Sequence, residues 1–116
     1  MASGRMRRVD AAIREVLAEA LLGLADPRIG FTTVTSVTTS PDLRHARVYV
    51  SVLGDEDARR ESLVGLDAAH GVLQGQLGRE LTLKHTPTLT FVHDDTAERS
   101  IRIGSLLAEG QRERPA

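Results

Sequence analysis

Residues 62–80 read SLVGLDAAHGVLQGQLGRE, and this stretch decides the fold. The run Ala69-His70-Gly71 interrupts it, and Gly75 and Gly78 follow. Each glycine inside a helix costs about 1 kcal/mol relative to alanine. Apolar residues nevertheless keep the spacing of one helix face: Leu63, Leu66, Ala69, Leu73 and Leu77. The pattern predicts a helix over about residues 58–80 that kinks or breaks near Ala69-His70-Gly71. The second piece would then present free N–H groups and a positive dipole end to an anion such as a nucleic-acid phosphate.

A first helix is predicted upstream, from about Met6 to Leu24, and Asp26-Pro27 ends it. Its apolar face is formed by Val9, Ile13, Val16, Leu17, Ala20, Leu21 and Leu24. Two strands follow, separated by the turn residues Ser40-Pro41-Asp42. They are a Thr- and Val-rich stretch from Phe31 to Ser40, and a stretch from Ala46 in which valines alternate with polar residues. We expect these two strands to form a hairpin.

The first of these strands contains a local irregularity. Val34 and Val37 fall on opposite parities, which predicts a bulge or a strand that is buried on both sides. A third strand is predicted at about Thr88 to His93, where Leu89 and Phe91 point one way and Pro87 marks the start.

A short helical segment with Ile101, Ile103, Leu106 and Leu107 comes last, and Gln111 to Ala116 is expected to be a disordered tail. The order helix, strand, strand, broken helix, strand, helix predicts an α+β fold with helices on one face of a three-stranded sheet. The expected organisation is one domain over residues 1–110 and a tail over 111–116.

Composition narrows the function classes. The chain has 116 residues, 41% hydrophobic and 27% charged residues, and no cysteine, which excludes a disulfide framework and thiolate chemistry and suits a reducing cytosol. It has no signal-peptide pattern and no apolar run of about 18 residues, so we expect a cytoplasmic protein. The net charge of −1 argues against a nucleic-acid partner. However, the charges are clustered by sign. The basic residues Arg5, Arg7 and Arg8 lie near the N-terminus, and the acidic residues Asp55, Glu56 and Asp57 lie together. A net charge of −1 is therefore compatible with an electrostatic field that is positive on one side of the protein.

Several separated motifs resemble the ribosome-binding factor A family in order and spacing. They are Ala25-Asp26-Pro27-Arg28-Ile29-Gly30, Ser40-Pro41-Asp42-Leu43, Val48-Tyr49-Val50-Ser51 and Thr86-Pro87-Thr88-Leu89-Thr90-Phe91 with Asp94 following. The resemblance covers about residues 5–107. It implies a type II KH-like domain in which an Ala-x-Gly kink replaces the usual Gly-x-x-Gly loop, and Ala69-His70-Gly71 occupies that place.

The resemblance also implies a function. The chain is expected to be a cytoplasmic assembly factor, not an enzyme, that needs no cofactor or metal. It would bind the free small (30S) ribosomal subunit and its 16S rRNA, and assist late maturation and 16S rRNA processing. An assembly GTPase is a further candidate partner, and the chain is expected to be a monomer without membrane contact.

The scarcity of aromatic residues bears on how RNA would be recognised. Phe31 and Phe91 are interpreted as core and Tyr49 as a residue of the wet sheet face, which leaves little for base stacking. We expect recognition through shape and phosphate contacts. The candidate RNA-binding residues are Arg5, Arg7, Arg8, Arg44, Arg47, Ala69, His70, Gly71, Arg79 and Lys84. Each of the charged ones is equally compatible with a solvated surface charge.

The sequence departs from the family at two places. Gln74 stands where many members carry a basic residue, which removes a phosphate contact. Gly75-Gln76-Leu77-Gly78 has the literal Gly-x-x-Gly spacing of a KH nucleotide clamp but lies a turn too late. We favour the interpretation that Gly75 and Gly78 are small residues that allow close helix packing. The alternative is that they form a second RNA clamp.

Catalytic and metal sites have little support. His45, His70, His85 and His93 are scattered without zinc-ligand spacing, and Asp94-Asp95 resembles a helix start more than an acid–base pair. The sequence has neither a nucleophile elbow nor a phosphate-binding Gly-x-x-x-x-Gly-Lys loop. The remaining alternative is a protein-interaction adaptor that has the KH-like fold but no direct RNA contact, which the net charge and Gln74 favour. The salt dependence of binding would distinguish the RNA-binding factor from the adaptor, because binding through phosphates weakens steeply with added salt.

Overall fold

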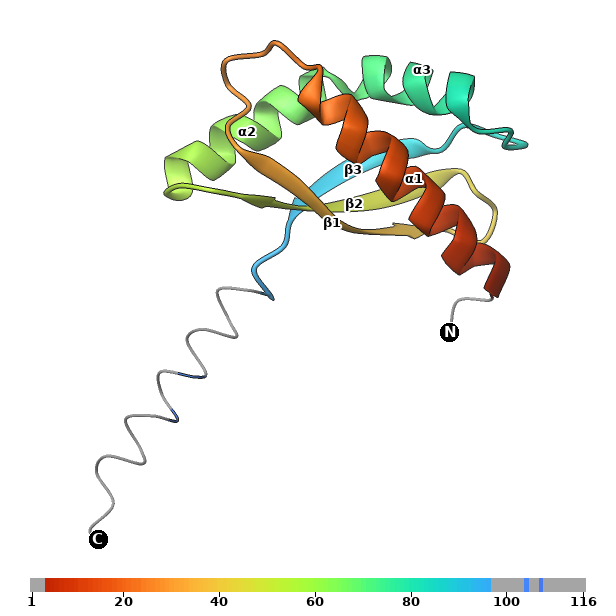
Figure 1. The fold of residues 1–116 in the computed structure, drawn as a ribbon, viewed down its shortest axis with the longest axis horizontal. Coiled ribbons are helices and arrows are strands. Elements are labelled where there is room, and N and C mark those ends of the chain that lie inside the picture. The colour runs from red at the N-terminus through yellow and green to blue at the C-terminus, as the bar shows by residue number, and fades with distance from the viewer. Residues whose placement is uncertain (1–3, 97–103, 105–106, 108–116) are drawn as a thin grey trace, which may run out of the picture.

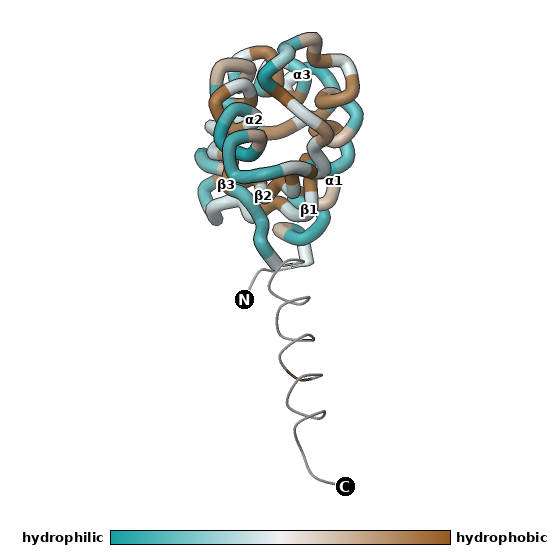
Figure 2. The backbone as a smooth tube through the Cα atoms, turned by 90° about the vertical axis from the view of Figure 1, so that its left-hand side faces the viewer, coloured by the Kyte–Doolittle hydropathy of each residue, from teal (hydrophilic) through white to brown (hydrophobic). Residues whose placement is uncertain are grey.

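The computed structural model describes residues 4–96 and positions 104 and 107. Its elements are α1 (Gly4–Leu22), β1 (Thr32–Thr39), β2 (His45–Val52), α2 (Glu56–Ala68), α3 (His70–Glu80) and β3 (Thr88–His93) (Figure 1). The three helices cover one face of the sheet, as the side view in Figure 2 also shows. The predicted α+β fold is therefore confirmed. The expectations for Ile101, Ile103, Leu106 and the tail lie outside the described residues.

The sheet has the order β1-β2-β3 and mixed polarity. β1 and β2 form the predicted antiparallel hairpin, with Val34 opposite Val50 and Thr39 opposite Ala46. β3 runs parallel to β2, because the chain crosses over the sheet through α2 and α3 before it returns.

The predicted irregularity in β1 is a bulge between Val34 and Ser36. The Thr35 hydroxyl at this bulge lies 3.2 Å from Tyr49 O and 2.7 Å from Asp94 Oδ2. These contacts fasten the bulged strand to the end of β3, two strands away. The insertion of one residue explains why Val34 and Val37 can both be buried on the same face.

The core lies between the helices and the inner face of the sheet. Its fully buried side chains come from every layer: Ile13 and Leu17 of α1, Leu66 of α2, Leu73 and Leu77 of α3, and Val48 and Val50 of β2. Burial of one such side chain stabilises the fold by about 1.5–3 kcal/mol. The polar residues Arg47, Tyr49 and Ser51 alternate with the buried valines of β2, so the opposite face of the sheet is open to solvent.

The helical segment breaks at one residue, Ala69 (φ −88°, ψ 1°), whose N–H donates to Gly65 O (3.0 Å) and Leu66 O (3.1 Å). The break was predicted, but its attribution to glycine is wrong. α3 runs as a regular helix through Gly71, Gly75 and Gly78. A Cβ built at Gly71 would have no described heavy atom within 4 Å outside its own helical neighbourhood, and Gly71 has no positive φ.

The glycine that a close approach does require is Gly65, one turn before the break. A Cβ there would lie 2.6 Å from Ile29 Cγ1. The loop that contains Ile29 is fixed on α2 by the buried Ser62, whose hydroxyl accepts the Gly30 N–H at 3.0 Å and donates to Arg28 O at 3.4 Å. The Asp26-Pro27 stop signal thus opens a loop that packs tightly against the broken helix.

Two further expectations need correction. α1 spans residues 4–22 and not 6–24, because Gly23 and Leu24 already form turns with N–H groups bonded to Ala20 O and Leu21 O. Phe31 was expected in the core, but it precedes β1 and is 75% exposed. Phe91, by contrast, packs against the core as predicted.

Candidate nucleic-acid interface

Three segments that are far apart in the sequence meet at the right-hand end of the molecule in Figure 1. They are the start of α1, the turn between β1 and β2, and the loop between α3 and β3. They enclose a groove of about 640 Å³, which we call the basic-end groove. The groove is lined by Arg5, Met6, Pro41, Asp42, Leu43, Arg44, Lys84 and His85.

Hydrogen bonds hold these segments together. The Thr88 N–H donates to Arg44 O (2.8 Å), which joins the start of β3 to the hairpin turn. The Asp10 carboxylate accepts the Thr39 N–H (3.0 Å) and the Thr39 hydroxyl, which joins α1 to the end of β1. Thr39 is buried, so loss of this acceptor would leave polar groups unsatisfied. The segments that carry the cations of the groove are therefore joined by hydrogen bonds.

The turn itself is built around Asp42. Its carboxylate accepts the Ser40 hydroxyl (2.6 Å) and the Arg44 N–H (3.0 Å), and these two hydrogen bonds, in that order, lower the pKa of Asp42. Leu43 then adopts a left-handed conformation (φ 60°). Arg44 Nε lies 3.9 Å from Asp42 Oδ2, which is a loose, exposed pair. The Arg44 guanidinium therefore remains able to contact an anion.

A second strip of polar residues extends this groove towards the sheet. It is lined by Arg44, His45, Lys84, His85, Thr86 and Thr88. Beyond it, on the open face of the sheet, Arg47 and Tyr49 line a shallow hollow with Thr38 and Thr90. Arg5, Arg44, Arg47 and Lys84 are all exposed. One end of the molecule thus collects three of the candidate cations, and Arg47 follows on the open face of the sheet.

The other candidates lie elsewhere. Arg7 and Arg8 are exposed on α1 but do not line the groove. Ala69, His70 and Gly71 lie at the start of α3, and this eleven-residue helix, at about 1.5 Å per residue, separates them from the basic-end groove by roughly 16 Å. His70 Nδ1 lies 2.6 Å from Asp67 O. The predicted interface is therefore divided into a basic end and a kink.

Two side chains of α3 have defined partners. Arg79 Nη2 donates to Gln76 Oε1 at 2.8 Å, so this candidate cation rests on its own helix. Gln74 Nε2 donates to Pro87 O at 3.0 Å, which ties α3 to the start of β3. Gly75 and Gly78 are helical, so the literal Gly-x-x-Gly spacing does not form a loop.

Sequence reasoning missed His85 and the backbone turn as parts of the groove. The adjacent Lys84 was the available signal for His85, because both residues precede the strand that pairs with β2. Within residues 4–96, 104 and 107, no group of three or more His, Asp or Glu side chains could hold a metal ion. The same residues include no helix that combines the length and the apolar character needed to cross a bilayer.

The arrangement favours anion binding. Arginine and lysine side chains contact phosphates, and histidine can contribute hydrogen bonds. The polar strip and the shallow hollow continue the groove along the sheet, as a site for an extended polyanion requires.

Comparisons with known proteins show which family the chain resembles. The family model for ribosome-binding factor A matches residues 5–107. The chain is 48% identical over 113 residues to the ribosome-binding factor A of Frankia alni, covering 97% of this chain and 55% of that protein. It is 44% identical over 108 residues to that of Pelobacter propionicus, covering 92% and 88%.

A crystal structure and a fitted homology model have the same fold as this chain. The crystal structure of ribosome-binding factor A from Thermus thermophilus superposes with a TM-score of 0.69 at 30% identity, covering 76% of this chain and 94% of that one. A Thermus thermophilus homology model fitted into the cryo-EM map of a complex of the factor with the 30S subunit superposes with a TM-score of 0.65 at 28% identity, covering 78% and 97%. The family model's range includes the helices, the hairpin, the break at Ala69 and the basic-end groove. The chain belongs to the ribosome-binding factor A family.

Proposed function

We propose that this protein binds the free small ribosomal subunit through its 16S rRNA and assists late maturation and rRNA processing in the cytoplasm, without enzymatic activity. Family membership carries this proposal, together with the Thermus thermophilus factor that was fitted into a 30S complex map. The chain acts as a monomer in this proposal.

The basic-end groove is the proposed rRNA contact. Arg5, Arg44 and Lys84 come from three separate segments, and an RNA backbone that follows the groove would meet them in turn. Phosphate contacts of this kind position a protein without reading bases. Arg47 on the open face of β2 would extend the contact along the sheet.

Sedimentation tests the proposal directly. The protein is mixed with purified small subunits, large subunits or complete ribosomes, and each mixture is pelleted through sucrose at several salt concentrations. We expect association with free small subunits, weakening as salt rises, because released counterions drive binding to phosphates. Equal pelleting with all three particles, or with none, would contradict it.

The adaptor without direct RNA contact remains a second candidate, supported by the net charge of −1. Binding to small subunits that hardly changes between low and high salt would favour this adaptor over the rRNA-binding function.

A further inference from the structure

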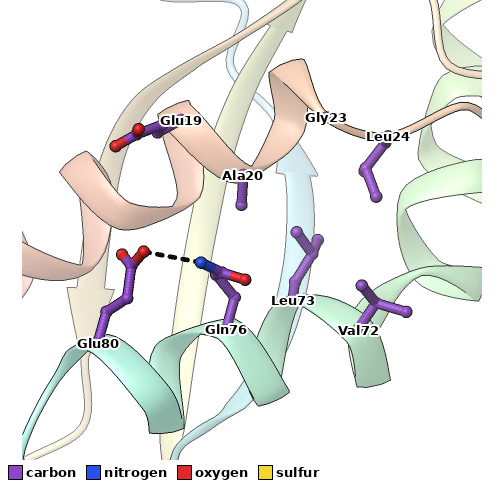
Figure 3. Close-up of a pocket in the computed structure, with 8 residues that line it drawn as sticks. All are labelled: Glu19, Ala20, Gly23, Leu24, Val72, Leu73, Gln76 and Glu80. Atoms are coloured by element: carbon purple, nitrogen blue, oxygen red, sulfur yellow. Dashed lines mark hydrogen bonds between the residues drawn. The ribbon is translucent and has the colours of Figure 1, made fainter.

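A second groove lies between α1 and α3, and its charge is opposite to that of the basic-end groove. Figure 3 shows the residues that line it, from Glu19, Ala20, Gly23 and Leu24 on one helix and its following turn to Val72, Leu73, Gln76 and Glu80 on the other. Its volume of about 300 Å³ is at the lower limit for small-molecule pockets, about 300–1,000 Å³. This size suits a protein side chain. We call it the helix groove.

The helix groove has an apolar part and an acidic part. Ala20 and Leu73 point towards each other, and Leu24 and Val72 lie at one end, as Figure 3 shows. Val72 is 64% exposed although it is a large aliphatic residue on a helix that packs on the core. Glu19 and Glu80 lie at the other end, one from each helix.

Neither carboxylate at the acidic end is neutralised. Glu80 accepts a hydrogen bond from Gln76 Nε2 (2.7 Å), which is an uncharged donor. The Glu19 carboxylate forms no hydrogen bond or ion pair with any residue that the structure describes. The nearby cation Arg79 donates to Gln76 Oε1 and does not line the groove. Two carboxylates therefore face solvent beside an apolar surface.

We propose that the helix groove receives a basic, extended protein segment. The methylene stem of an arginine or lysine would lie along Ala20 and Gln76, above the fully buried Leu73, while its head reaches Glu19 and Glu80, as long cationic side chains commonly do. A neighbouring apolar side chain would cover Val72. RNA does not fit this groove, because its phosphates would face two carboxylates.

A defined peptide probe tests the site on the free protein. The probe is an acetylated, amidated hexapeptide of alternating leucine and arginine, and the control peptide carries uncharged citrulline in place of arginine. Binding is followed by amide chemical shifts. We expect saturable shifts at Ala20, Val72 and Gln76, and affinity for the citrulline peptide about fivefold lower or less, given the strength of exposed charge pairs.

Matched variants test whether the carboxylates of Glu19 and Glu80 cause the preference for the arginine peptide. The double variant Glu19→Gln, Glu80→Gln should lose about fivefold in affinity for the arginine peptide. The control Glu56→Gln, Glu61→Gln removes the same charge from exposed positions of α2 and should bind like the parent. Urea unfolding of each variant checks that the fold is retained. Equal losses in both variants, or shifts spread over α2, would overturn the proposal.

Photo-crosslinking tests the site in the particle, and this arm rests on the proposed function. A benzophenone side chain is placed at Val72 in one protein and at Thr86, beside the basic-end groove, in another, and each is irradiated with small subunits. We expect a subunit protein in the Val72 adduct and rRNA in the Thr86 adduct. An rRNA adduct at Val72, or an adduct at Thr86 alone, would overturn the inference. Failure of both proteins to sediment with subunits would instead contradict the proposed function, and the peptide result would then decide the inference.

Discussion

The basic-end groove and the helix groove lie on one small domain and carry opposite charge. The first gathers Arg5, Arg44 and Lys84 from three segments, and the second places Glu19 and Glu80 beside exposed apolar surface. A net charge of −1 conceals both. The sum of charges therefore says little about partners when a fold sorts the charges onto different surfaces.

Charge reversal in the basic-end groove should have the largest effect. Arg44→Glu with Lys84→Glu should weaken small-subunit binding about 100-fold, since each lost charged hydrogen bond is worth about 1.5 kcal/mol. The slope of log affinity against log salt should fall by about 0.7–0.9 for each lost phosphate contact. Arg14→Glu with Arg60→Glu, at exposed sites outside both grooves, is the matched control. Equal losses in the two pairs would mean that binding responds to overall charge, and the comparison would fail.

The two glycines near the helix break should respond in opposite directions. Gly65→Leu should destabilise the fold by about 1–3 kcal/mol, because a Cβ there already lies 2.6 Å from Ile29 Cγ1. Gly71→Leu should stabilise it by up to about 1 kcal/mol, because the space there is open. Urea unfolding measures both, and similar losses in the two variants would show that Gly71 is as closely packed in solution as Gly65.

Subunit binding by the Gly71→Leu variant tests whether the kink at Ala69-His70-Gly71 contacts the small subunit. We expect binding to the small subunit to fall by several-fold while the salt slope stays that of the parent, because leucine blocks an approach to the kink without removing a charge. A reduced slope would place phosphate at the kink and extend the rRNA contact from the basic end to α3. Unchanged binding would make Ala69-His70-Gly71 a structural break alone.

A smaller effect is expected at Asp10, which supports the basic-end groove without lining it. Asp10→Ala should cost about 1–2 kcal/mol of stability, because the buried Thr39 N–H and hydroxyl lose their acceptor. Asp10→Asn keeps an acceptor oxygen and should cost less. Subunit binding at a temperature where both variants are folded should fall in Asp10→Ala only. A normal affinity there would show that the groove does not need this anchor.

The smallest effect belongs to Asp94, far from the basic-end groove. Hydrogen bonds from Thr96 and Thr35 hold its pKa at about 2, below the ordinary value of 3.8. A carboxylate with a depressed pKa stabilises the fold above about pH 4, and this contribution is lost as pH falls from about 4 to about 2. Asp94→Asn should therefore flatten the dependence of stability on pH in that window, and by less than about 1 kcal/mol, because the group is close to solvent. Binding of the Asp94→Asn variant at about pH 7 should not change, because Asp94 does not line the basic-end groove.

Most of the fold could be predicted from local patterns. The bounds of the third strand, the hairpin and its bulge, and the helix break near residue 70 all follow from periodicity and turn residues. Which glycine needs to lack a side chain could not be predicted, because Gly71 and Gly65 are indistinguishable until Ile29 is known to pack against one of them. Phe31 was misplaced because an aromatic residue next to a strand has the same pattern whether it begins the strand or precedes it.

The sequence predicted several residues of the candidate site, but it did not predict which of them lie close together. Arg5, Arg44 and Lys84 were chosen by charge, but only the tertiary contacts Thr88 to Arg44 and Thr39 to Asp10 bring them to one end. Arg79 was also chosen by charge, but it does not line the basic-end groove, and its guanidinium donates to Gln76 in its own helix. The acidic helix groove could not be foreseen either, because Glu19 and Glu80 are 61 residues apart and meet only when α1 packs beside α3.

The parallel pairing of β3 with β2 has a consequence for how the protein is made. Antiparallel β1 and β2 can pair as soon as their turn forms, but β3 can add only after the whole crossover through α2 and α3 has been synthesised. The Thr88 N–H that closes the basic-end groove on Arg44 therefore arrives late on the ribosome. A nascent chain stalled before residue 88 would carry the hairpin and helices without the assembled cations, so the basic-end groove would form only after β3 has been synthesised.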